Sequence, residues 1–416
     1  MVYKLGKILI GIILLYLFWF KEAYMESSLV LYISTILLIV LFFLSIYLKK
    51  YKLNLKNSNS NYGIVKTFFI FGCYSLFTGF FLVKDRVLFY NQLFIFFSYT
   101  LICFFIYYFS ADKNNFLWLL KTIVFIGVSC SIQTIIFPYY YSNGSVVVTT
   151  MSKTNNPNTL GLVSCFSIFS LGMLLVQRKI KIKSLFWGLN FLFIYIIILT
   201  GSRKCLFSGM FLMIYFFIDF FCGKKVSKNQ ILKIIPWVFS ISIIILFMRE
   251  KILYFYLNSS SFERLQLFFK SISENKRLKL YEDAILFWKV NPLFGIGFNQ
   301  YRVFSIFRYY SHSTYAEILS CSGLVGIILF FTPFIFLIVK LIKVSFSKKY
   351  IYRNIYRYIL IMIIVELFLG VGQIFIYDLF HMVILTYLFG ESFNYLNKER
   401  KYANKKKNRK SCIVFG

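Results

Sequence analysis

The chain has 416 residues, of which 59% are hydrophobic, 22% aromatic and only 15% charged, with a mean hydropathy of +0.72. A soluble globular protein is about half apolar and about a quarter charged, so this surplus of apolar side chains cannot be buried in one water-soluble core. Five Pro and 21 Gly exclude a collagen-like or a Pro/Gly-rich disordered chain. The composition predicts an all-α protein that crosses a membrane many times.

A helix needs about 20 mostly apolar residues to cross a bilayer, and twelve runs of this kind follow one another along the chain. The predicted spans are Leu5–Phe20, Ser28–Leu48, Gly63–Val83, Val87–Ser110, Phe116–Pro138, Thr159–Val176, Ser184–Thr200, Cys205–Cys222, Ile234–Met248, Gly323–Lys343, Tyr356–Gly372 and Ile374–Gly390. The first run lacks the small-residue cleavage site of a signal peptide, so we interpret it as a span. Four regions result: spans one to nine in 1–248, a large loop in 249–322, spans ten to twelve in 323–390 and a tail in 391–416.

The net charge of +32 comes from 47 Lys and Arg against 15 Asp and Glu. In a soluble protein this excess would indicate a nucleic-acid partner, but membrane proteins place Lys and Arg according to topology. With the N-terminus in the cytoplasm, 29 basic residues fall in cytoplasmic segments and six in the short outer loops. This asymmetry predicts that both termini are cytoplasmic and that the charge reflects orientation and attraction to anionic lipids, not nucleic acid. The tail Lys398–Lys410 is interpreted as solvated and lipid-facing, with RNA binding as the alternative.

The eight cysteines lie mostly within the predicted spans, with no CxxC pair and no Cys/His cluster. This placement is typical of small apolar packing residues and indicates neither a disulfide framework nor a metal site. The sequence contains no Walker loop, dinucleotide fingerprint, HExxH motif or internal repeat.

The connection from Arg249 to Ser322 is the longest, and it falls on the outer side. Long loops in compact proteins are functional or disordered, and this one is too apolar for disorder. Apolar residues recur in it at helical spacing, at Leu278, Tyr281, Ile285 and Trp288. They predict an amphipathic helix at the membrane surface that ends before Pro292, and a lid packed over the spans fits the same pattern.

Two cations, Arg203 and Lys204, stand at an outer helix end against the positive-inside trend. Anchoring to lipid headgroups is one interpretation of this pair. The other is that the guanidinium of Arg203 binds a phosphate through two hydrogen bonds, which a lysine cannot do.

The stretch from Ser311 to Gly326 contains one of only two histidines, His312. Thr314 and Glu317 have capping-box spacing, so we expect a helix to begin near Thr314 and Glu317 to act as its cap. His312 would then precede a positive helix end that disfavours imidazolium, and a neutral imidazole is what a general base requires. Gly323 and Gly326 would permit close contact between helices.

In order and placement these motifs resemble the bacterial O-antigen ligase and Wzy-type polysaccharide polymerase superfamily. Its members have about a dozen spans and one large outer loop near the C-terminal third. Its ligases carry a His followed by Asn, Ser or Gln, nine further residues and Gly-x-x-Gly, which here corresponds to His312, Ser313, Gly323 and Gly326.

Three further elements of the family have counterparts in this chain. Its small-residue–Ser–Arg element before a span is similar to Gly201–Arg203, and its Asn-Pro-Asn then Gly element is similar to Asn156–Asn158 and Gly161. Its loop arginine, amphipathic helix and Pro-x-x-Gly-x-Gly run resemble Arg277 through Gly297. Arg264 is the alternative loop arginine, and we prefer Arg277 because its spacing to Pro292 fits the family better.

The resemblance implies an enzyme of the bacterial cytoplasmic membrane that transfers an oligosaccharide from polyprenyl diphosphate to a hydroxyl of a second glycan. It assigns neutralisation of the leaving diphosphate to Arg203 and Arg277, with Lys204 and Arg264 as helpers, and the general base to His312. Asn156 and Asn158 are the remaining candidate substrate-binding residues. No cofactor or metal is expected, because arginines take the charge and no Asp/Glu cluster is present.

The implied partners are a polyprenyl-diphosphate-linked oligosaccharide, membrane lipids and candidate assembly proteins such as a flippase or a chain-length regulator. The leading hypothesis is a polymerase of capsule or O-antigen repeat units, and a ligase that transfers finished glycan is the second. A transporter or flippase of lipid-linked sugars is the alternative of a different class, although neither repeats nor broken helices at mid-membrane are evident.

Three more ionisable residues lie inside predicted spans: Glu366, Asp378 and His381. Intramembrane charges are functional candidates by default. Asp378 and His381 share a helix face, and we interpret them as a structural pair, with Glu366 meeting a cation from another helix.

Overall fold

The computed structural model describes residues 2–20, 33, 35–40, 42–43, 63–110, 116–140, 146–148, 157–177, 179–180, 183–222, 276–347 and 350–414. The predicted span Ile234–Met248 lies outside the described residues, as does much of Ser28–Leu48. The chain divides into two compact units. Unit 1 comprises Met1–Tyr16, Tyr24–Leu119 and Lys276–Gly416, and unit 2 comprises Leu17–Ala23 and Leu120–Asn275.

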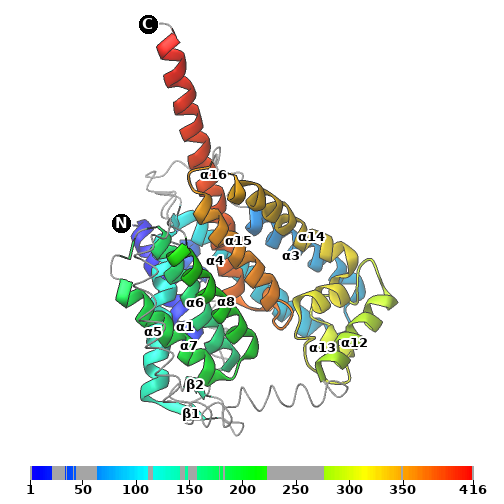
Figure 1. Cartoon of the computed structure of the whole chain (residues 1–416). Helices are drawn as coiled ribbons and strands as arrows, with labels where there is room; N and C mark the ends of the chain where they lie inside the picture. Colours follow the sequence, from blue (N-terminus) through cyan, green and yellow to red (C-terminus); the bar gives the residue numbers. More distant parts are fainter. Residues whose placement is uncertain are drawn as a thin grey trace. The chain divides into compact units, whose positions relative to one another are not determined.

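Unit 1 contains most of the first helix and all of the C-terminal helices (Figure 1). Its elements are α1 (Val2–Phe20), α3 (Gly63–Leu82), α4 (Arg86–Ser110), α12 (Lys276–Val290), α13 (Tyr301–Phe304), α14 (Thr314–Phe346), α15 (Arg353–Leu369), the 3-10 helix η3 (Phe375–Tyr377) and α16 (Leu379–Val414). In Figure 1, α12 and α13 lie together beyond the N-terminal end of α14, whereas α16 runs to the C-terminus.

Unit 2 contains the middle of the chain. Its elements are most of α5 (Leu117–Ile136), strands β1 (Pro138–Tyr140) and β2 (Val146–Val148), and helices α6 (Pro157–Val176), α7 (Lys183–Thr200) and α8 (Arg203–Cys222). The strands form an antiparallel hairpin in which Pro138 is paired with Val148. This hairpin is a departure from the all-α prediction, and its Val and Tyr residues have high strand propensity.

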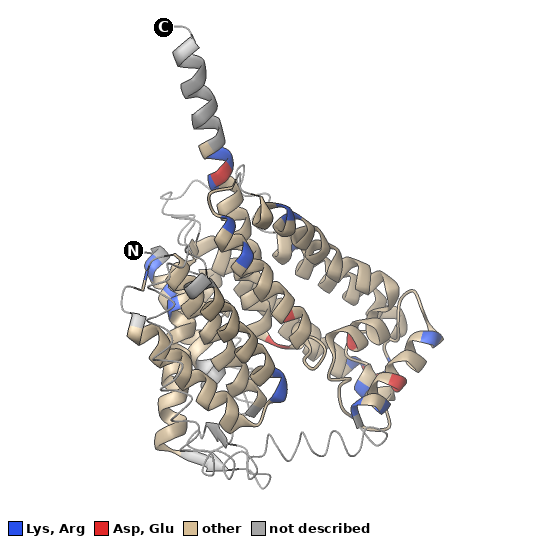
Figure 2. Cartoon of the chain, in the orientation of Figure 1, with Lys and Arg blue, Asp and Glu red and all other residues tan. Residues whose placement is uncertain are grey.

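Helices α3 to α8 coincide with the predicted spans to within a few residues. Among the described residues, five helices are long and apolar enough to cross a membrane, namely α3, α4, α5, α14 and most of α6. The chain is therefore a multi-pass membrane protein, and the total of twelve spans stays a prediction. In unit 1, Lys and Arg gather around α12 and α13 and at the opposite end on α14 and α16, whereas the middle of these helices carries few (Figure 2). That distribution is typical of helices whose central part lies in lipid.

An aromatic cluster joins the helices of unit 1 to the chain that follows α12. Phe298 contacts Phe71 of α3 and Phe96 of α4 at ring-centroid distances of 6.2 and 5.8 Å. Phe330 of α14 contacts Phe68 and Phe71 of α3 at 6.1 and 5.5 Å. Edge-to-face and offset pairs at these distances are favourable. The cluster ties Phe298, in the segment after α12, to the middle of α3 and α4, and it ties the middle of α14 to α3.

Unit 2 is organised around α6, which is buried along most of its length. Close helix packing depends on glycines: a Cβ added at Gly172 would lie 2.1 Å from the ring of Phe216 in α8. Ser167 of α6 donates a hydrogen bond to the carbonyl of Ile123 in α5 at 3.2 Å. These contacts hold α5 and α8 against α6 and thereby fix the start of α8.

Candidate active site

Arg203 and Lys204 are the first two residues of α8, directly after a tight turn. Gly201 has a φ of +64°, in the left-handed region, and its N–H donates to the carbonyl of Ile198, so it ends α7 in the manner of a C-terminal glycine. Ser202 then takes the N-cap position, because its carbonyl accepts from the N–H of Leu206 at 2.9 Å. Both cations are thus held at the start of a helix, and their side chains are half-buried.

The Asn-Pro-Asn…Gly element meets this turn inside unit 2. Gly161 lies so close to it that an added Cβ would be 3.1 Å from the hydroxyl of Thr200 and 3.2 Å from Cys205. The Cys205 thiol also lies 4.0 Å from the carbonyl of Asn158. Two motifs that are more than 40 residues apart are therefore neighbours, and Asn158 stands next to the helix start that carries Arg203. Asn156 lies outside the described residues.

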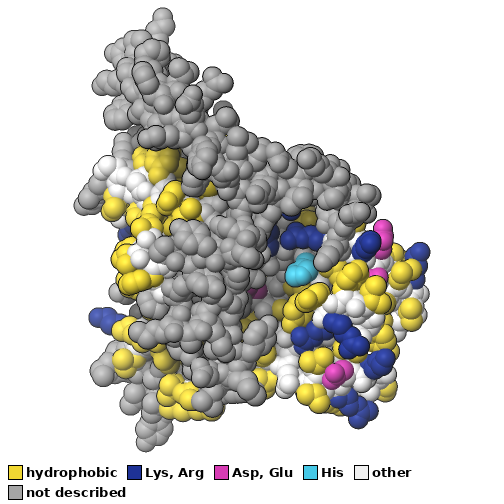
Figure 3. All heavy atoms as spheres, turned by 90° about the horizontal axis from the view of Figure 1, so that it is seen from below, with side chains coloured by type: hydrophobic (Ala, Val, Ile, Leu, Met, Phe, Trp, Pro, Cys, Tyr) yellow, Lys and Arg dark blue, Asp and Glu magenta, His cyan; other side chains and the backbone are white. Residues whose placement is uncertain are grey.

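The predicted amphipathic helix is α12, which ends at Val290, just before Asn291 and Pro292. Its buried face holds Leu280 and Ala284 against Tyr301 and Cys321. Its exposed side combines apolar and basic side chains, including Leu286 at 58% exposure and the charged Lys279. Figure 3 shows hydrophobic, Lys and Arg side chains intermixed over this part of the surface. This mixture is the expected character of a helix at a membrane surface.

Three hydrogen bonds fix α12 in unit 1. The hydroxyl of Tyr301 donates to the carbonyl of Leu280 at 2.6 Å, and Ser305 donates to the carboxylate of Asp283 at 2.9 Å. The hydroxyl of Tyr281 donates to the carbonyl of Val371 at 2.8 Å, in the turn after α15. Burial raises the pKa of Tyr281, and the positive charge of Arg277 opposes that shift. Arg277, one turn before Tyr281, is exposed near this turn. Arg264 lies outside the described residues.

The two glycine motifs of the resemblance pack directly against each other. The N–H groups of Ile296 and Gly297 donate to the carbonyls of Ser320 and Cys321, both at 2.9 Å. In return, the N–H groups of Leu324 and Val325 donate to the carbonyls of Pro292 and Leu293 at 2.9 and 3.2 Å. Backbone hydrogen bonds thus pair residues 292–297, which follow α12, with residues 320–325 of α14, as they would pair two neighbouring β-strands.

Gly295 and Gly323 make this approach possible. Gly323 interrupts α14 with a φ of +64° and a ψ of −165°, and a Cβ there would lie 2.3 Å from the carbonyl oxygen of Leu293. A Cβ at Gly295, whose φ is +74°, would lie 2.5 Å from the carbonyl carbon of Cys321. Gly323 therefore serves contact between two backbones rather than the contact between helices that was expected. Tyr74 of α3 donates to the carbonyl of Ser322 at this break, at 2.7 Å.

His312 lies two residues before the start of α14, as predicted, and its side chain is exposed. Its φ of +56° is in the left-handed region, where non-glycine residues are uncommon. Ser313 is the N-cap of α14, and its hydroxyl accepts from the N–H of Ala316 at 3.4 Å. The N-cap is therefore Ser313 and not Thr314, and the predicted capping box with Glu317 does not form. Glu317 does not bond the N-cap N–H; its carboxylate accepts from the N–H and the hydroxyl of Ser311 at 3.0 and 2.7 Å.

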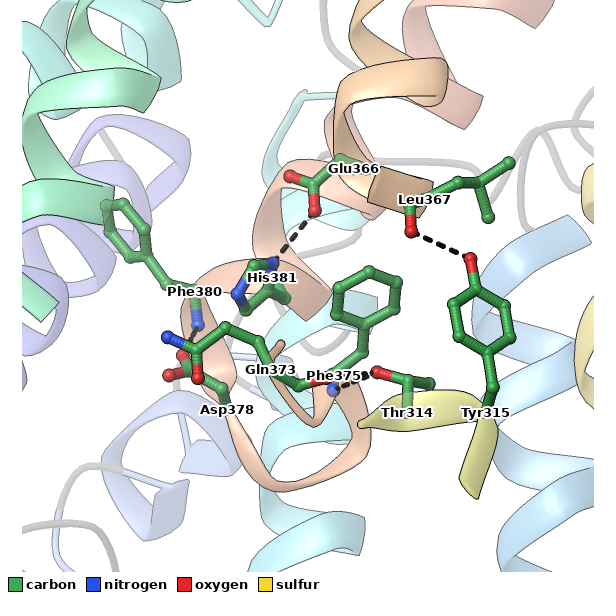
Figure 4. A network of polar contacts seen from close by, with 9 residues as sticks. All are labelled: Thr314, Tyr315, Glu366, Leu367, Gln373, Phe375, Asp378, Phe380 and His381. Atoms are coloured by element: carbon green, nitrogen blue, oxygen red, sulfur yellow. Dashed lines mark hydrogen bonds and ion pairs between the residues drawn. The ribbon is translucent and has the colours of Figure 1, made fainter. Parts of the chain in front are cut away.

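The turn after α15 holds the start of α14 from the other side (Figure 4). The N–H of Thr314 donates to the carbonyls of Gly370 and Gln373, and its hydroxyl donates to Gln373 and accepts from the N–H of Phe375. Because Tyr281 reaches Val371 in the same turn, the segments that carry Arg277 and His312 both contact residues 370–373. The structure thus brings these two candidates to one turn of unit 1. Arg203, Lys204 and Asn158 belong to unit 2.

The buried charged residues near this turn pair differently from the prediction. The carboxylate of Glu366 in α15 lies 2.8 Å from Nδ1 of His381 in α16, and both side chains are fully buried (Figure 4). Asp378 instead accepts from the N–H of Phe380 at 2.8 Å and caps the start of α16. His381 is thus bonded to Glu366 of another helix, while Asp378 lies at the N-cap of α16 because η3 delays the start of that helix. The ring of Phe375 stacks on His381 at 4.7 Å, so the pair supports η3.

Sequence reasoning missed two buried polar residues, Asn299 and Gln300. The amide oxygen of Gln300 accepts from the N–H groups of Lys84 and Asp85, and its NH₂ donates to the carbonyl of Asp85. Asn299 donates to the carbonyl of Leu88 at 2.9 Å. These bonds attach the connection between α3 and α4 to the segment after α12. Two consecutive amides after a Gly-x-Gly run were the available signal.

Residues 188–331, about a third of the chain, match the family model described as O-antigen ligase. The matched segment begins in α7 and ends in α14, so it includes the Arg203 turn, α12, both glycine motifs and His312. No curated protein matches the chain. The match confirms the resemblance to the O-antigen ligase and Wzy superfamily, whose members act on lipid-linked oligosaccharides.

Proposed function

We propose that this protein is a polymerase that joins lipid-linked oligosaccharide repeat units on the outer side of the bacterial cytoplasmic membrane. The donor glycan is carried by polyprenyl diphosphate, such as undecaprenyl diphosphate. The acceptor hydroxyl forms a bond to the anomeric carbon of the donor, and the bond from that carbon to the diphosphate oxygen breaks. The electron pair leaves with the diphosphate, and the proton of the hydroxyl passes to His312.

The observation that carries this proposal is that one segment, which matches the O-antigen ligase family model, contains Arg203, Arg277 and His312. Arg203 and Arg277 stand in the first turns of α8 and α12, and neither first turn contains an acidic residue. A cation at a helix N-terminus is unfavourable, because that end already carries partial positive charge. A bound diphosphate would compensate both the cation and the helix end. The arginine and the helix end would in turn stabilise the negative charge that develops on the diphosphate as it leaves.

His312 supports the second half of the reaction. It is the one exposed histidine of the chain, since the other, His381, is fully buried and paired with Glu366. Its position before the start of α14 suits a neutral imidazole that accepts a proton. The turn 370–373 connects its segment to that of Arg277, so base and cation belong to one framework.

Ligation of a finished glycan is the second candidate, because the matched family is described as an O-antigen ligase. Both reactions use the same donor and differ in the acceptor. The deciding experiment reconstitutes the pure protein in liposomes with the lipid-linked repeat unit that accumulates when the gene is deleted. A polymerase produces a ladder of longer lipid-linked glycans from this substrate alone, whereas a ligase requires a different acceptor, and a flippase moves the glycan without lengthening it.

Point variants test the assigned roles in the same assay. His312→Ala should lower the rate by about 10²–10⁴-fold, the usual contribution of a general base, and should leave undecaprenyl diphosphate binding intact. Arg203→Lys keeps the charge but loses the planar fork, so it should weaken donor binding and polymer formation. Arg86→Lys, the same change at the start of α4, is the matched control and should behave as wild type. Wild-type polymer from both His312→Ala and Arg203→Lys would contradict the proposed roles.

A further inference from the structure

The segment before α14 contains a buried carboxylate that the proposed reaction does not use. Glu317 lies in the first turn of α14 and its side chain is fully buried. Its carboxylate accepts hydrogen bonds from the N–H and hydroxyl of Ser311, from the hydroxyl of Tyr377 at 3.2 Å, and from the thiol of Cys321 at 3.8 Å. All four groups can donate, so the two carboxylate oxygens of Glu317 are the common acceptors of this cluster.

The Ser311 hydroxyl connects this carboxylate to both sides of His312. Its single proton is shared between the carboxylate of Glu317 at 2.7 Å and the carbonyl of Ser313 at 3.0 Å, and its oxygen accepts from the N–H of Ser313 at 3.4 Å. Ser311 and Ser313 are the direct neighbours of His312 in the chain, and both are buried. The backbone of His312 is therefore held at both ends, while its side chain remains exposed.

Such a restraint is needed because His312 has an unfavourable backbone conformation. A non-glycine residue at positive φ costs about 1–2 kcal/mol and persists when its surroundings determine it. Two bonds from Ser311 reach the same buried carboxylate oxygen of Glu317, which makes Glu317 a suitable anchor. Tyr310, which precedes Ser311, is also fixed. Its hydroxyl accepts from the guanidinium of Arg302 at 3.0 Å, and its ring centroid lies 5.4 Å from that of Tyr377.

We infer that Ser311 and Glu317 are positioning residues that hold His312 in the orientation in which it takes the proton from the acceptor hydroxyl. This inference rests on the proposed role of His312. It predicts that weakening the hydrogen bonds between Ser311 and Glu317 lowers kcat while leaving donor binding nearly unchanged, because neither side chain is assigned to the diphosphate. A displacement of about 1 Å in a catalytic group can cost about 100-fold in rate, so we expect a 10–100-fold lower kcat in Ser311→Ala.

The test compares Ser311→Ala with Ser320→Ala. Both serines are fully buried, and Ser320 bonds within α14, to the carbonyl of Ala316 at 2.8 Å, without reaching the segment of His312. Ser320→Ala should therefore keep the wild-type kcat. Tyr377→Phe removes one donor from Glu317 but leaves both bonds from Ser311, so its effect should be smaller than that of Ser311→Ala. Glu317→Gln replaces one acceptor oxygen with an NH₂ group at nearly equal volume, so it should show at least the loss seen in Ser311→Ala.

A spectroscopic readout makes the test independent of activity. The chain has only two histidines, and His381 is fully buried, so selectively labelled imidazoles give one NMR signal for each. We expect one sharp His312 signal in wild type and in Ser320→Ala, and a shifted or broadened signal in Ser311→Ala and Glu317→Gln. The reaction of His312 with diethyl pyrocarbonate should change in the same two variants.

The outcomes separate this inference from the proposed function. Full activity in His312→Ala would refute the role of His312 as a base, whereas the NMR signals would still report whether Ser311 and Glu317 hold its segment. An inactive His312→Ala together with a wild-type kcat and an unchanged His312 signal in Ser311→Ala would overturn the inference. If Glu317→Gln does not fold, Ser311→Ala decides, since it loses only a hydroxyl.

Discussion

The contact between the two glycine motifs leads to a quantitative prediction for Gly323→Ala. The backbone angles of Gly323, φ +64° and ψ −165°, belong to a region that is essentially restricted to glycine. Another residue there costs about 1–3 kcal/mol from backbone strain alone. The added Cβ would also lie 2.3 Å from the oxygen and 2.4 Å from the carbonyl carbon of Leu293, so the two backbones must separate.

That separation breaks the bonds from Leu324 to Pro292 and from Val325 to Leu293. Each such bond contributes about 0.5–1.5 kcal/mol net, so the expected total, with the strain, is about 2–6 kcal/mol of lost stability. This is a large fraction of the stability of a typical domain. We therefore expect Gly323→Ala to lower the apparent Tm of the protein in detergent and to accelerate amide exchange in residues 292–297 and 320–325.

Gly188→Ala is the matched control for this experiment. Gly188 lies inside α7, and an added Cβ there meets no atom within 4 Å. Ala is favoured over Gly in a helix interior by about 0.5–1 kcal/mol, so this variant should be as stable as wild type or slightly more stable. The measurements are thermal unfolding of the purified protein and hydrogen exchange followed by mass spectrometry. A Gly323→Ala variant with the Tm and the local protection of Gly188→Ala would refute the reasoning.

Three further predictions concern topology and the buried charges of unit 1. Because basic residues mark the cytoplasmic loops, a single cysteine at Lys181 should label only from the cytoplasm and one at Ser145 only from outside; reversed labelling would contradict the proposed orientation. His381→Leu leaves the carboxylate of Glu366 buried without its 2.8 Å partner, which should cost about 3–5 kcal/mol and lower protein abundance; normal abundance with lost activity would instead give the pair a catalytic role. Asp378→Ala removes a helix cap worth about 0.5–2 kcal/mol, whereas Asn preserves it, so only the Ala variant should show a lower Tm.

Several features of this protein followed from local sequence because short-range physics determines them. Runs of about 20 apolar residues predicted α3 to α8 within a few residues, since a backbone in lipid must satisfy its hydrogen bonds internally. Helical spacing and Pro292 predicted α12 and its end, and the capping-box spacing of Thr314 and Glu317 predicted the start of α14 near Thr314. The family was also recognisable, because its motifs are short and keep their order.

Other predictions failed where a residue's partner is distant in the sequence. Glu366 is 15 residues from His381, and whether Glu366 or Asp378 bonds His381 depended on η3, which delays the start of α16. Glu317 had the spacing of a helix cap, but its carboxylate turned toward Ser311 and Tyr377. Periodicity cannot select among such partners, because it reports which face of a helix is apolar and not which polar groups another segment presents.

The sequence by itself determined that this is a multi-pass helical membrane protein with an amphipathic helix next to two glycine motifs and an exposed histidine. Only the tertiary structure showed that Gly295 and Gly323 serve one backbone contact, and that the segments of Arg277 and His312 meet at the turn 370–373. The reason is physical. The requirements that lipid and helix geometry place on a segment depend on that segment's own residues, so the local sequence predicts them. Hydrogen bonds between segments depend on which distant segments pack together, and only the tertiary structure shows this.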